Sequence, residues 1–271
     1  MADECIFVLV VAHPDDESMF FFPTLNLITT LQIENSNSLL PKISNHHSNI
    51  TTYSTYVLCL SNGGYDNLGH VHEKEMCDVR KKCYDLNPNH AKVVNHEDLQ
   101  DNPHMHWNED VISDTVQNYI KDIIKERSKS LSCIPSNSTP STSSQPNHQI
   151  CIFAFGNYGA SGHINHISAS RGVRKFLCKQ KPQNYDAKVF ELQSIKSNLL
   201  RKYFFPIDWC YYKYNKSKYQ RNKQFILVMT FHPWNAWRAM SLHASQFAWY
   251  RKLSILFSRY CFANTFQEVS F

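Results

Sequence analysis

The sequence predicts a single-domain α/β protein with a Rossmann-like, mostly parallel sheet that has helices on both faces. Short apolar runs alternate with longer stretches of helical pattern along the whole chain. The apolar runs have the near-continuous hydrophobicity of strands that are buried on both faces of a parallel sheet. A chain of 271 residues with 42% hydrophobic residues is long enough for one substantial core.

Six strands and three main helices are expected. In chain order the strands are expected at residues 6–11, 55–60, 91–94, 150–155, 188–193 and 224–229. The helical stretches expected between them are 70–86, 109–127 and 165–178. In this layout a ligand binds outside the carboxyl ends of the strands.

Four further segments have distinctive composition. Residues 128–149, rich in Ser, Pro and Asn, are expected to form a disordered surface insertion, and residues 35–54 a second loop. The end of the chain, 239–271, is expected to be a helical segment. Its part 247–260 mixes aromatic, aliphatic and basic residues, which suits either an interfacial helix on anionic lipid or an ordinary core helix. The aromatic stretch 203–214 leaves the same choice open.

Charge and cysteine usage exclude some functions. The net charge of +5 comes from scattered basic residues, so no nucleic-acid partner is expected. Nine cysteines without paired spacing favour a reduced, intracellular protein. The apolar runs are too short for a transmembrane helix, and no targeting peptide is recognisable.

A histidine and three consecutive acids follow the first expected strand, in the stretch AHPDDE (residues 12–17). Adjacent carboxylates repel one another, so a fold keeps them where positive charge neutralises them or where chemistry needs them. The simplest explanation is the start of a helix, whose N-terminal end favours acids. The other explanation is a metal site.

A second cluster, GASGHINH (residues 159–166), follows the fourth expected strand. His163 and His166 are three residues apart and so share one face of a starting helix. His13, Asp16 and His166 together offer the open three-ligand set of a catalytic Zn²⁺ site, or a site for another divalent cation. Asp15 is then free to act as general base, and His163 to stabilise the oxyanion and protonate a leaving amine. The sequence therefore predicts metal-assisted amide hydrolysis.

These motifs resemble those of the PIG-L/LmbE-like de-N-acetylases, and the resemblance runs through nearly the whole chain. Besides AHPDDESMFF and SGHINH it includes LSNGGYDNLG, DNPHMHW, LQSIKSNLLRKY and AMSLHASQFAWYRKLSILFSRY. The last two point to the eukaryotic branch, which acts on a lipid-linked sugar. The resemblance implies zinc-dependent conversion of N-acetylglucosaminylphosphatidylinositol into glucosaminylphosphatidylinositol and acetate, an early step of glycosylphosphatidylinositol anchor biosynthesis. It also implies peripheral association with the cytoplasmic face of the endoplasmic reticulum membrane.

Three positions depart from the family pattern. Gly156 stands where relatives commonly have an acid, His72 where they often have an arginine, and Asn165 where many bacterial relatives have an aspartate. A histidine in place of an arginine gives a weaker, pH-dependent contact with substrate.

The substrate-binding candidates are His72, Asp98 and His243. For Asp98 the competing explanation is a solvated loop acid, and for His243 a buried packing residue. Two other functions stay open: a soluble de-N-acetylase of a small N-acetylglucosamine conjugate, and a binding module of the same fold that has lost catalysis.

Overall fold

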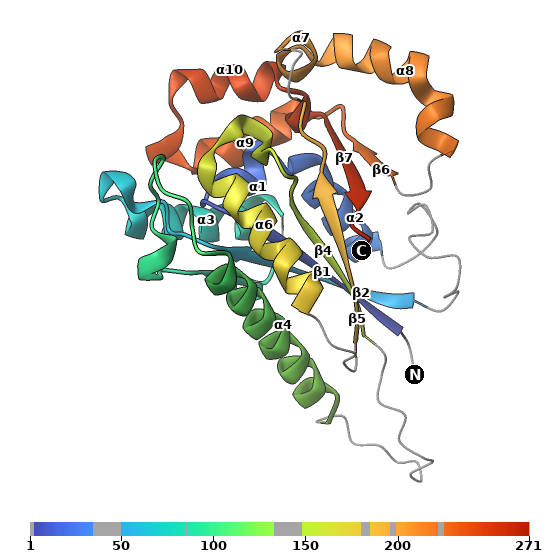
Figure 1. The fold of residues 1–271 in the computed structure, drawn as a ribbon. Helices are drawn as coiled ribbons and strands as arrows, with labels where there is room; N and C mark the ends of the chain where they lie inside the picture. Colours follow the sequence, from blue (N-terminus) through green and yellow to red (C-terminus); the bar gives the residue numbers. More distant parts are fainter. Residues whose placement is uncertain are drawn as a thin grey trace.

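The computed structural model describes residues 3–34, 50–84, 86–132, 148–179, 185–195, 199–221 and 225–270. They form one seven-stranded sheet with the strand order β3-β2-β1-β4-β5-β7-β6 (Figure 1). The strands are β1 (Asp3–Val11), β2 (Ile50–Cys59), β3 (Ala91–Val93), β4 (His148–Phe155), β5 (Tyr185–Leu192), β6 (Phe225–Met229) and β7 (Ala263–Glu268). Neighbouring strands from β3 to β5 are parallel, whereas β7 runs antiparallel to both β5 and β6. The predicted α/β fold with a mostly parallel sheet is confirmed.

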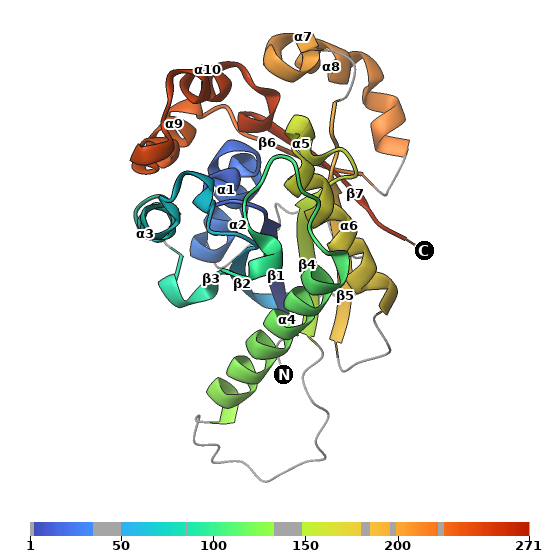
Figure 2. The same ribbon diagram turned by 60° about the vertical axis from the view of Figure 1, so that its left-hand side comes forward.

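Helices cover both faces of the sheet, as Figures 1 and 2 show. One face carries α4 (Glu109–Ser132) and α6 (Ile164–Lys179), and the opposite face carries α2 (Phe22–Glu34) and α3 (Gly69–Cys83). The short helices α1 (Asp16–Met19) and α5 (Gly159–Gly162) follow β1 and β4 directly. The remaining helices gather at one end of the molecule: α7 (Leu199–Tyr203), α8 (Phe205–Arg221), α9 (Pro233–Leu242) and α10 (Trp249–Phe257).

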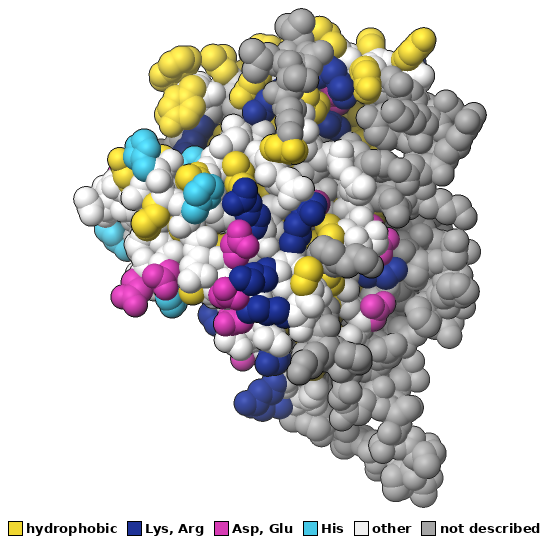
Figure 3. All heavy atoms as spheres, viewed as in Figure 1, with side chains coloured by type: hydrophobic (Ala, Val, Ile, Leu, Met, Phe, Trp, Pro, Cys, Tyr) yellow, Lys and Arg dark blue, Asp and Glu magenta, His cyan; other side chains and the backbone are white. Residues whose placement is uncertain are grey.

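The core follows from the apolar strands. All residues from Ile6 to Val11 are at most 3% exposed, because β1 is paired on both edges and covered on both faces. The outer side of α4 and α6 is a soluble surface with interleaved acidic and basic side chains (Figure 3). Lys175 and Lys179, for example, both donate to the Asp110 carboxylate at 2.7 Å.

The centre of the sheet is its topological switch point. From β1 the chain proceeds outward through β2 to β3, then crosses to β4 on the other side of β1 and proceeds to β5. The segments that leave the carboxyl ends of β1 and β4 therefore diverge and leave a crevice between them. Both predicted metal-site motifs lie in these two segments.

The C-terminal prediction was wrong in part. Residues 239–271 were expected to be helical, yet they hold the end of α9, then α10, and then strand β7. The strand sequence ANTFQE contains little apolar signal because β7 pairs with β5 over only three residues and places Asn264 and Thr265 among buried polar contacts.

Two expected loops are shorter than predicted. Residues 50–54 belong to β2, residues 128–132 to α4, and residues 148 and 149 to β4. The remaining parts, 35–49 and 133–147, lie outside the described residues. Within the described ranges, none of the helices combines the length and the hydrophobicity needed to cross a membrane.

Candidate active site

The three consecutive acids are buried, and each faces a different basic side chain from later in the chain. Asp15, Asp16 and Glu17 are at most 3% exposed. The closest charged contacts are Asp15–Arg251 at 3.0 Å, Asp16–His166 at 3.1 Å and Glu17–His243 at 2.7 Å. The repulsion expected from the sequence is thus relieved by three separate partners rather than by solvent at a helix start.

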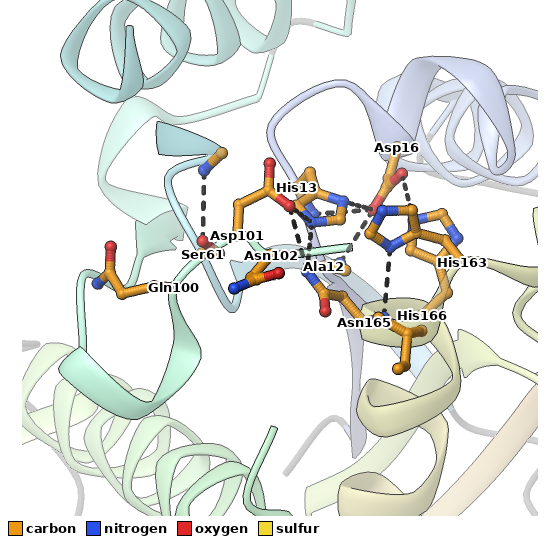
Figure 4. A network of polar contacts seen from close by, with 12 residues as sticks. Ala12, His13, Asp16, Ser61, Gln100, Asp101, Asn102, His163, Asn165 and His166 are labelled. Atoms are coloured by element: carbon orange, nitrogen blue, oxygen red, sulfur yellow. Dashed lines mark hydrogen bonds and ion pairs between the residues drawn. The ribbon is translucent and has the colours of Figure 1, made fainter. Parts of the chain in front are cut away.

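Asp16 lies at the centre of the crevice (Figure 4). Its Oδ2 accepts hydrogen bonds from the backbone N–H groups of Ala12 and His13, at 3.0 and 2.8 Å. Its Oδ1 lies 3.1 Å from His166 Nε2, and its Oδ2 lies 3.8 Å from His13 Nδ1. Burial alone would raise the pKa of Asp16, but the two imidazoles and these hydrogen bonds lower it to about 2. The carboxylate is therefore ionised and available as a ligand.

The two imidazoles beside Asp16 are each held at the nitrogen that faces away from it. His13 Nε2 lies 3.1 Å from Asp101 Oδ1, and His166 Nδ1 lies 3.1 Å from Ser161 Oγ. This leaves His13 Nδ1 and His166 Nε2 turned toward Asp16. Metal-binding histidines in proteins commonly use one ring nitrogen for the metal and the other for a carboxylate or hydroxyl partner. The donor set fits a divalent cation.

Asn165 ties this arrangement together. Its side chain is fully buried, and its Nδ2 donates to Asp101 Oδ1 at 3.2 Å and lies 3.2 Å from His13 Nε2. Burial lowers the pKa of His13, but the hydrogen bond to Asp101 and the nearby Asp16 outweigh burial and raise it. Burial likewise raises the pKa of Asp101, but His13 lowers it overall. The neutral Asn165 thus positions Asp101 against His13 without adding charge.

His163 completes the cluster. The ligand atoms of His13, His163 and His166 all lie within 4.8 Å of one another, with His163 half-buried. Burial, together with the neighbouring imidazoles of His166 and His13, lowers the pKa of His163. The structure therefore brings together all five residues predicted for metal binding and catalysis: His13, Asp15, Asp16, His163 and His166.

The turn between β4 and α6 sets the position of His166. Gly159 has φ +51, and a Cβ on it would lie 2.5 Å from the Cβ of His166. The next residue, Ala160, also has positive φ, at 30°. The His166 ring stacks on Phe155 at the end of β4, with ring centroids 4.2 Å apart. A tight turn without a side chain at its start therefore allows α6 to begin against the sheet.

The cluster lies in a crevice of about 480 Å³, a size suited to a small-molecule group. Its walls come from the ends of β1 and β4, from the 63–72 region, from Asp101, and from residues 245–251 ahead of and within α10. His72 lines the crevice as predicted, with Nδ1 3.0 Å from the Gly63 carbonyl oxygen.

Two substrate-binding candidates do not reach the crevice. Asp98 is exposed in the 3₁₀ turn Glu97–Leu99, where its carboxylate lies 3.8 Å from His96 Nδ1. Asp101, three residues further on, occupies the crevice instead. His243 is fully buried beneath the site and bound to Glu17, so the packing explanation holds for it.

Gly156 has a structural reason. A Cβ at this position would lie 2.5 Å from the carbonyl oxygen of Leu192, so the backbone of β5 leaves no room for a side chain. The support that an acid would give the histidines comes here from Asp101 and Ser161.

Sequence reasoning gave no role to Ser161 or Arg251. Ser161 lies within the GASGHINH motif and could have been suspected from its spacing to His166. Arg251 carries no local signal, because only the packing of α10 over the crevice brings its guanidinium to Asp15.

The fold and this site define an α/β protein of the PIG-L/LmbE-like class. The structure of N,N'-diacetylchitobiose deacetylase from Pyrococcus horikoshii superimposes with a TM-score of 0.54 at 12% identity, covering 99% of this chain and 84% of that one. No protein-family model matches the chain.

Sequence relatives narrow the class. N-acetylglucosaminyl-phosphatidylinositol de-N-acetylase of Bos taurus is 29% identical over 95% of this chain and 81% of its own length. The probable enzyme of the same name in Schizosaccharomyces pombe is 30% identical over 97% of this chain and 86% of its own length. The chain belongs to the N-acetylglucosaminyl-phosphatidylinositol de-N-acetylase family.

Proposed function

We propose that this protein removes the acetyl group from N-acetylglucosaminylphosphatidylinositol, giving glucosaminylphosphatidylinositol and acetate. The observation that carries the proposal is the buried carboxylate of Asp16 between His13 and His166, with the second carboxylate of Asp15 and the imidazole of His163 in the same crevice. Family membership supports the choice of substrate.

The cofactor proposed is Zn²⁺. His13 Nδ1, Asp16 and His166 Nε2 would hold it, since two imidazoles and one carboxylate are a common catalytic zinc set. When bound, the ion would polarise the acetyl carbonyl and lower the pKa of water to about 7.

The remaining residues would move the protons. Asp15 takes a proton from the water that adds to the acetyl carbonyl carbon. The carbon–nitrogen bond then breaks, the sugar nitrogen takes a proton from His163, and acetate leaves with the added oxygen. Asp15 is held by Arg251 at 3.0 Å, which fixes the direction of its carboxylate. His72 and Tyr250 line the crevice on the substrate side.

By its family, the proposed reaction is an early step of glycosylphosphatidylinositol anchor biosynthesis at the cytoplasmic face of the endoplasmic reticulum membrane. Fractionation of cells that express the tagged protein, combined with protease protection of intact microsomes, tests this location. Protection of the tag from added protease would contradict a cytoplasmic orientation.

Acetate release from the glycolipid by Asp15→Asn tests the mechanism. The variant is expected to keep its bound zinc and to lose about two to four decades of rate, because only the general base is removed. Asp98→Asn is the matched control: the same chemical change on an exposed acid outside the crevice should leave both zinc content and rate unchanged.

The alternatives give different results in the same assay. A zinc-loaded wild type that is inert on the lipid but active on a water-soluble N-acetylglucosaminide would support the small-conjugate enzyme. Substoichiometric zinc with no turnover of either substrate would support the binding module that has lost catalysis.

A further inference from the structure

Exposed apolar side chains concentrate at one end of the molecule. Of the fifteen large hydrophobic residues that are exposed in the described part of the chain, eleven lie between residues 203 and 257. They come from α7, α8, the start of α9, and α10, which lie at the same end in both ribbon views (Figures 1 and 2). Figure 3 shows hydrophobic side chains along this end, over α10 and α8. We call this set of exposed residues the apolar end.

The outward side of α10 is apolar, which reverses the usual pattern of a soluble helix. Trp249, Tyr250, Leu253 and Phe257 are between 46% and 73% exposed. Their spacing places them on neighbouring positions of successive turns. The inner side of the same helix holds the buried Ile255 and Arg251, which reaches Asp15.

A second apolar strip lies on α8. Ile207, Tyr211 and Tyr214 recur every three or four residues and are all exposed, and Tyr203 and Phe204 extend the strip at its start. Phe231, at the start of the α9 region, packs beside it with its ring centroid 5.8 Å from that of Trp209. Scattered apolar residues on a surface are ordinary, whereas a concentration of this extent marks an interaction surface.

The charge of this end is strongly positive. Residues 199–266 contain eleven Lys and Arg and one acid, Asp208, whereas the rest of the chain contains seventeen Lys and Arg and twenty-two acids. Asp208 is buried between Arg201 and Arg259, at 2.8 and 3.0 Å, so it does not offset the surface charge. Lys213 and Lys252 are exposed among the aromatic residues.

The apolar end borders the crevice. Ala248, Tyr250 and Arg251 line it, so the first turn of α10 belongs to both the crevice wall and the apolar end. Whatever covers this end must leave the crevice accessible to the substrate.

We propose that the apolar end docks on an anionic bilayer surface, with Trp249, Leu253 and Phe257 inserted at the level of the lipid headgroups. Trp, Tyr and Lys suit this interface because each combines an apolar body with a polar tip. A second copy of the chain fits poorly, since self-pairing would bring two strongly basic surfaces together. That the bilayer also carries the substrate rests on the proposed function; the docking itself does not.

Flotation with lipid vesicles tests the docking without any substrate. The full-length protein should float with vesicles of phosphatidylcholine and phosphatidylserine, and less with phosphatidylcholine alone or at high salt. Trp249→Ser with Leu253→Ser should lower the partition coefficient about tenfold or more, since burying each such side chain is worth about a factor of ten. Met105→Ser, an exposed apolar residue outside this end, should leave binding unchanged.

Two further measurements keep the proposal falsifiable. Lys213→Glu with Lys252→Glu should remove the preference for anionic vesicles while preserving the thermal melting temperature. On a short-chain, monomeric N-acetylglucosaminylphosphatidylinositol the Trp249/Leu253 variant should keep the wild-type rate, and on vesicles that contain the long-chain lipid it should lose it.

Each contrary result has a distinct meaning. Wild type that does not bind anionic vesicles at low salt overturns the docking, as does equal binding by the Trp249/Leu253 variant. If that variant instead abolishes self-association or binding to another protein, the apolar end belongs to that partner. Absence of turnover on the monomeric substrate with normal flotation would count against the proposed function and leave the docking standing.

Discussion

At the scale of single residues, burial and pairing explain the acidic run. Asp15, Asp16 and Glu17 begin α1, yet none of them is solvated, and each binds a side chain from a different later segment. Glu17, the deepest of the three, accepts from Ser18 Oγ as well as contacting His243. Three neighbouring charges can be buried together only because each meets its own partner.

The Glu17–His243 pair predicts a pH-dependent stability. Burial lowers the pKa of His243, but Glu17 outweighs burial and raises it above the ordinary value of 6.5. A histidine with a raised folded-state pKa stabilises the fold fully below the unfolded pKa, and this stabilisation is lost as the pH rises through the folded pKa. His243→Gln should therefore lower the free energy of unfolding by about 2 kcal/mol at low pH, and by less above the folded pKa.

Urea unfolding of both proteins from about pH 6 to about pH 9 measures this difference. His104→Gln, at an exposed histidine, is the control and should show a small difference that does not vary with pH. A difference for His243→Gln that grows with rising pH would show that the pair is neutral in the folded protein.

Gly159 gives a second residue-scale prediction. Alanine at Gly159 would bring a Cβ within 2.5 Å of His166, whereas alanine at Gly162, with φ +87, meets nothing within 4 Å. Both changes impose backbone strain of about 1 to 2 kcal/mol. Only Gly159→Ala should also weaken metal binding, by about ten- to a hundredfold, because it displaces His166. Competition with a chelating dye measures the affinity, and equal loss in the two variants would contradict this role of Gly159.

At the scale of elements, the antiparallel strand β7 connects the C-terminal helices to the site. Asn264 in β7 is fully buried; its Oδ1 accepts from Thr24 Oγ1 at 2.7 Å, and its Nδ2 donates to the Phe20 carbonyl at 2.8 Å. These bonds fasten β7 to α2 and to the end of α1, which carries Asp16. The strand is thus fixed by polar contacts rather than by an apolar pattern.

Asn264→Ala should therefore be strongly destabilising. It leaves the Thr24 hydroxyl and the Phe20 carbonyl without the partner they now have, and each such buried group costs about 1 to 3 kcal/mol. We expect a loss of about 2 to 4 kcal/mol in the free energy of unfolding, measured by urea titration. Asn235→Ala, at an exposed asparagine of α9, should change stability by less than about 0.5 kcal/mol. Similar losses in the two variants would refute the proposed anchoring of β7.

At the scale of the whole molecule, the crevice joins segments from the entire length of the chain. Its walls come from β1, the region after β2, the loop before α4, the start of α6, and the segment leading into α10. A ligand bound there by His13, Asp16 and His166 links the two halves of the sheet on either side of the switch point. Bound metal should consequently stabilise the entire fold.

Removal of divalent cations by a chelator should lower the melting temperature. Free zinc at about a hundred times its dissociation constant contributes about 2.7 kcal/mol, which corresponds to about 5 to 10 °C for a protein of this size. Restoring zinc should restore the melting temperature of wild type but not of Asp16→Asn. An equal response of the two proteins, measured by scanning calorimetry, would show that the stabilising ion binds elsewhere.

Much of this protein was determined by the sequence alone. The six apolar strands, the alternation with helices and the placement of AHPDDE and GASGHINH after strands fixed the sheet and predicted which five polar residues meet at its switch point. These features are local or follow from the topology of parallel strands, so a linear pattern is sufficient to reveal them.

Only the tertiary structure decided the rest. The pairing of Asp15 with Arg251, the burial of His243 against Glu17, the choice of Asp101 over Asp98 and the strand β7 all depend on contacts between distant segments. A polar side chain gives the same signal in the sequence whether it faces solvent or a buried partner. Which of the two it meets is set by packing, and that packing makes α10 both a wall of the crevice and an exposed apolar surface.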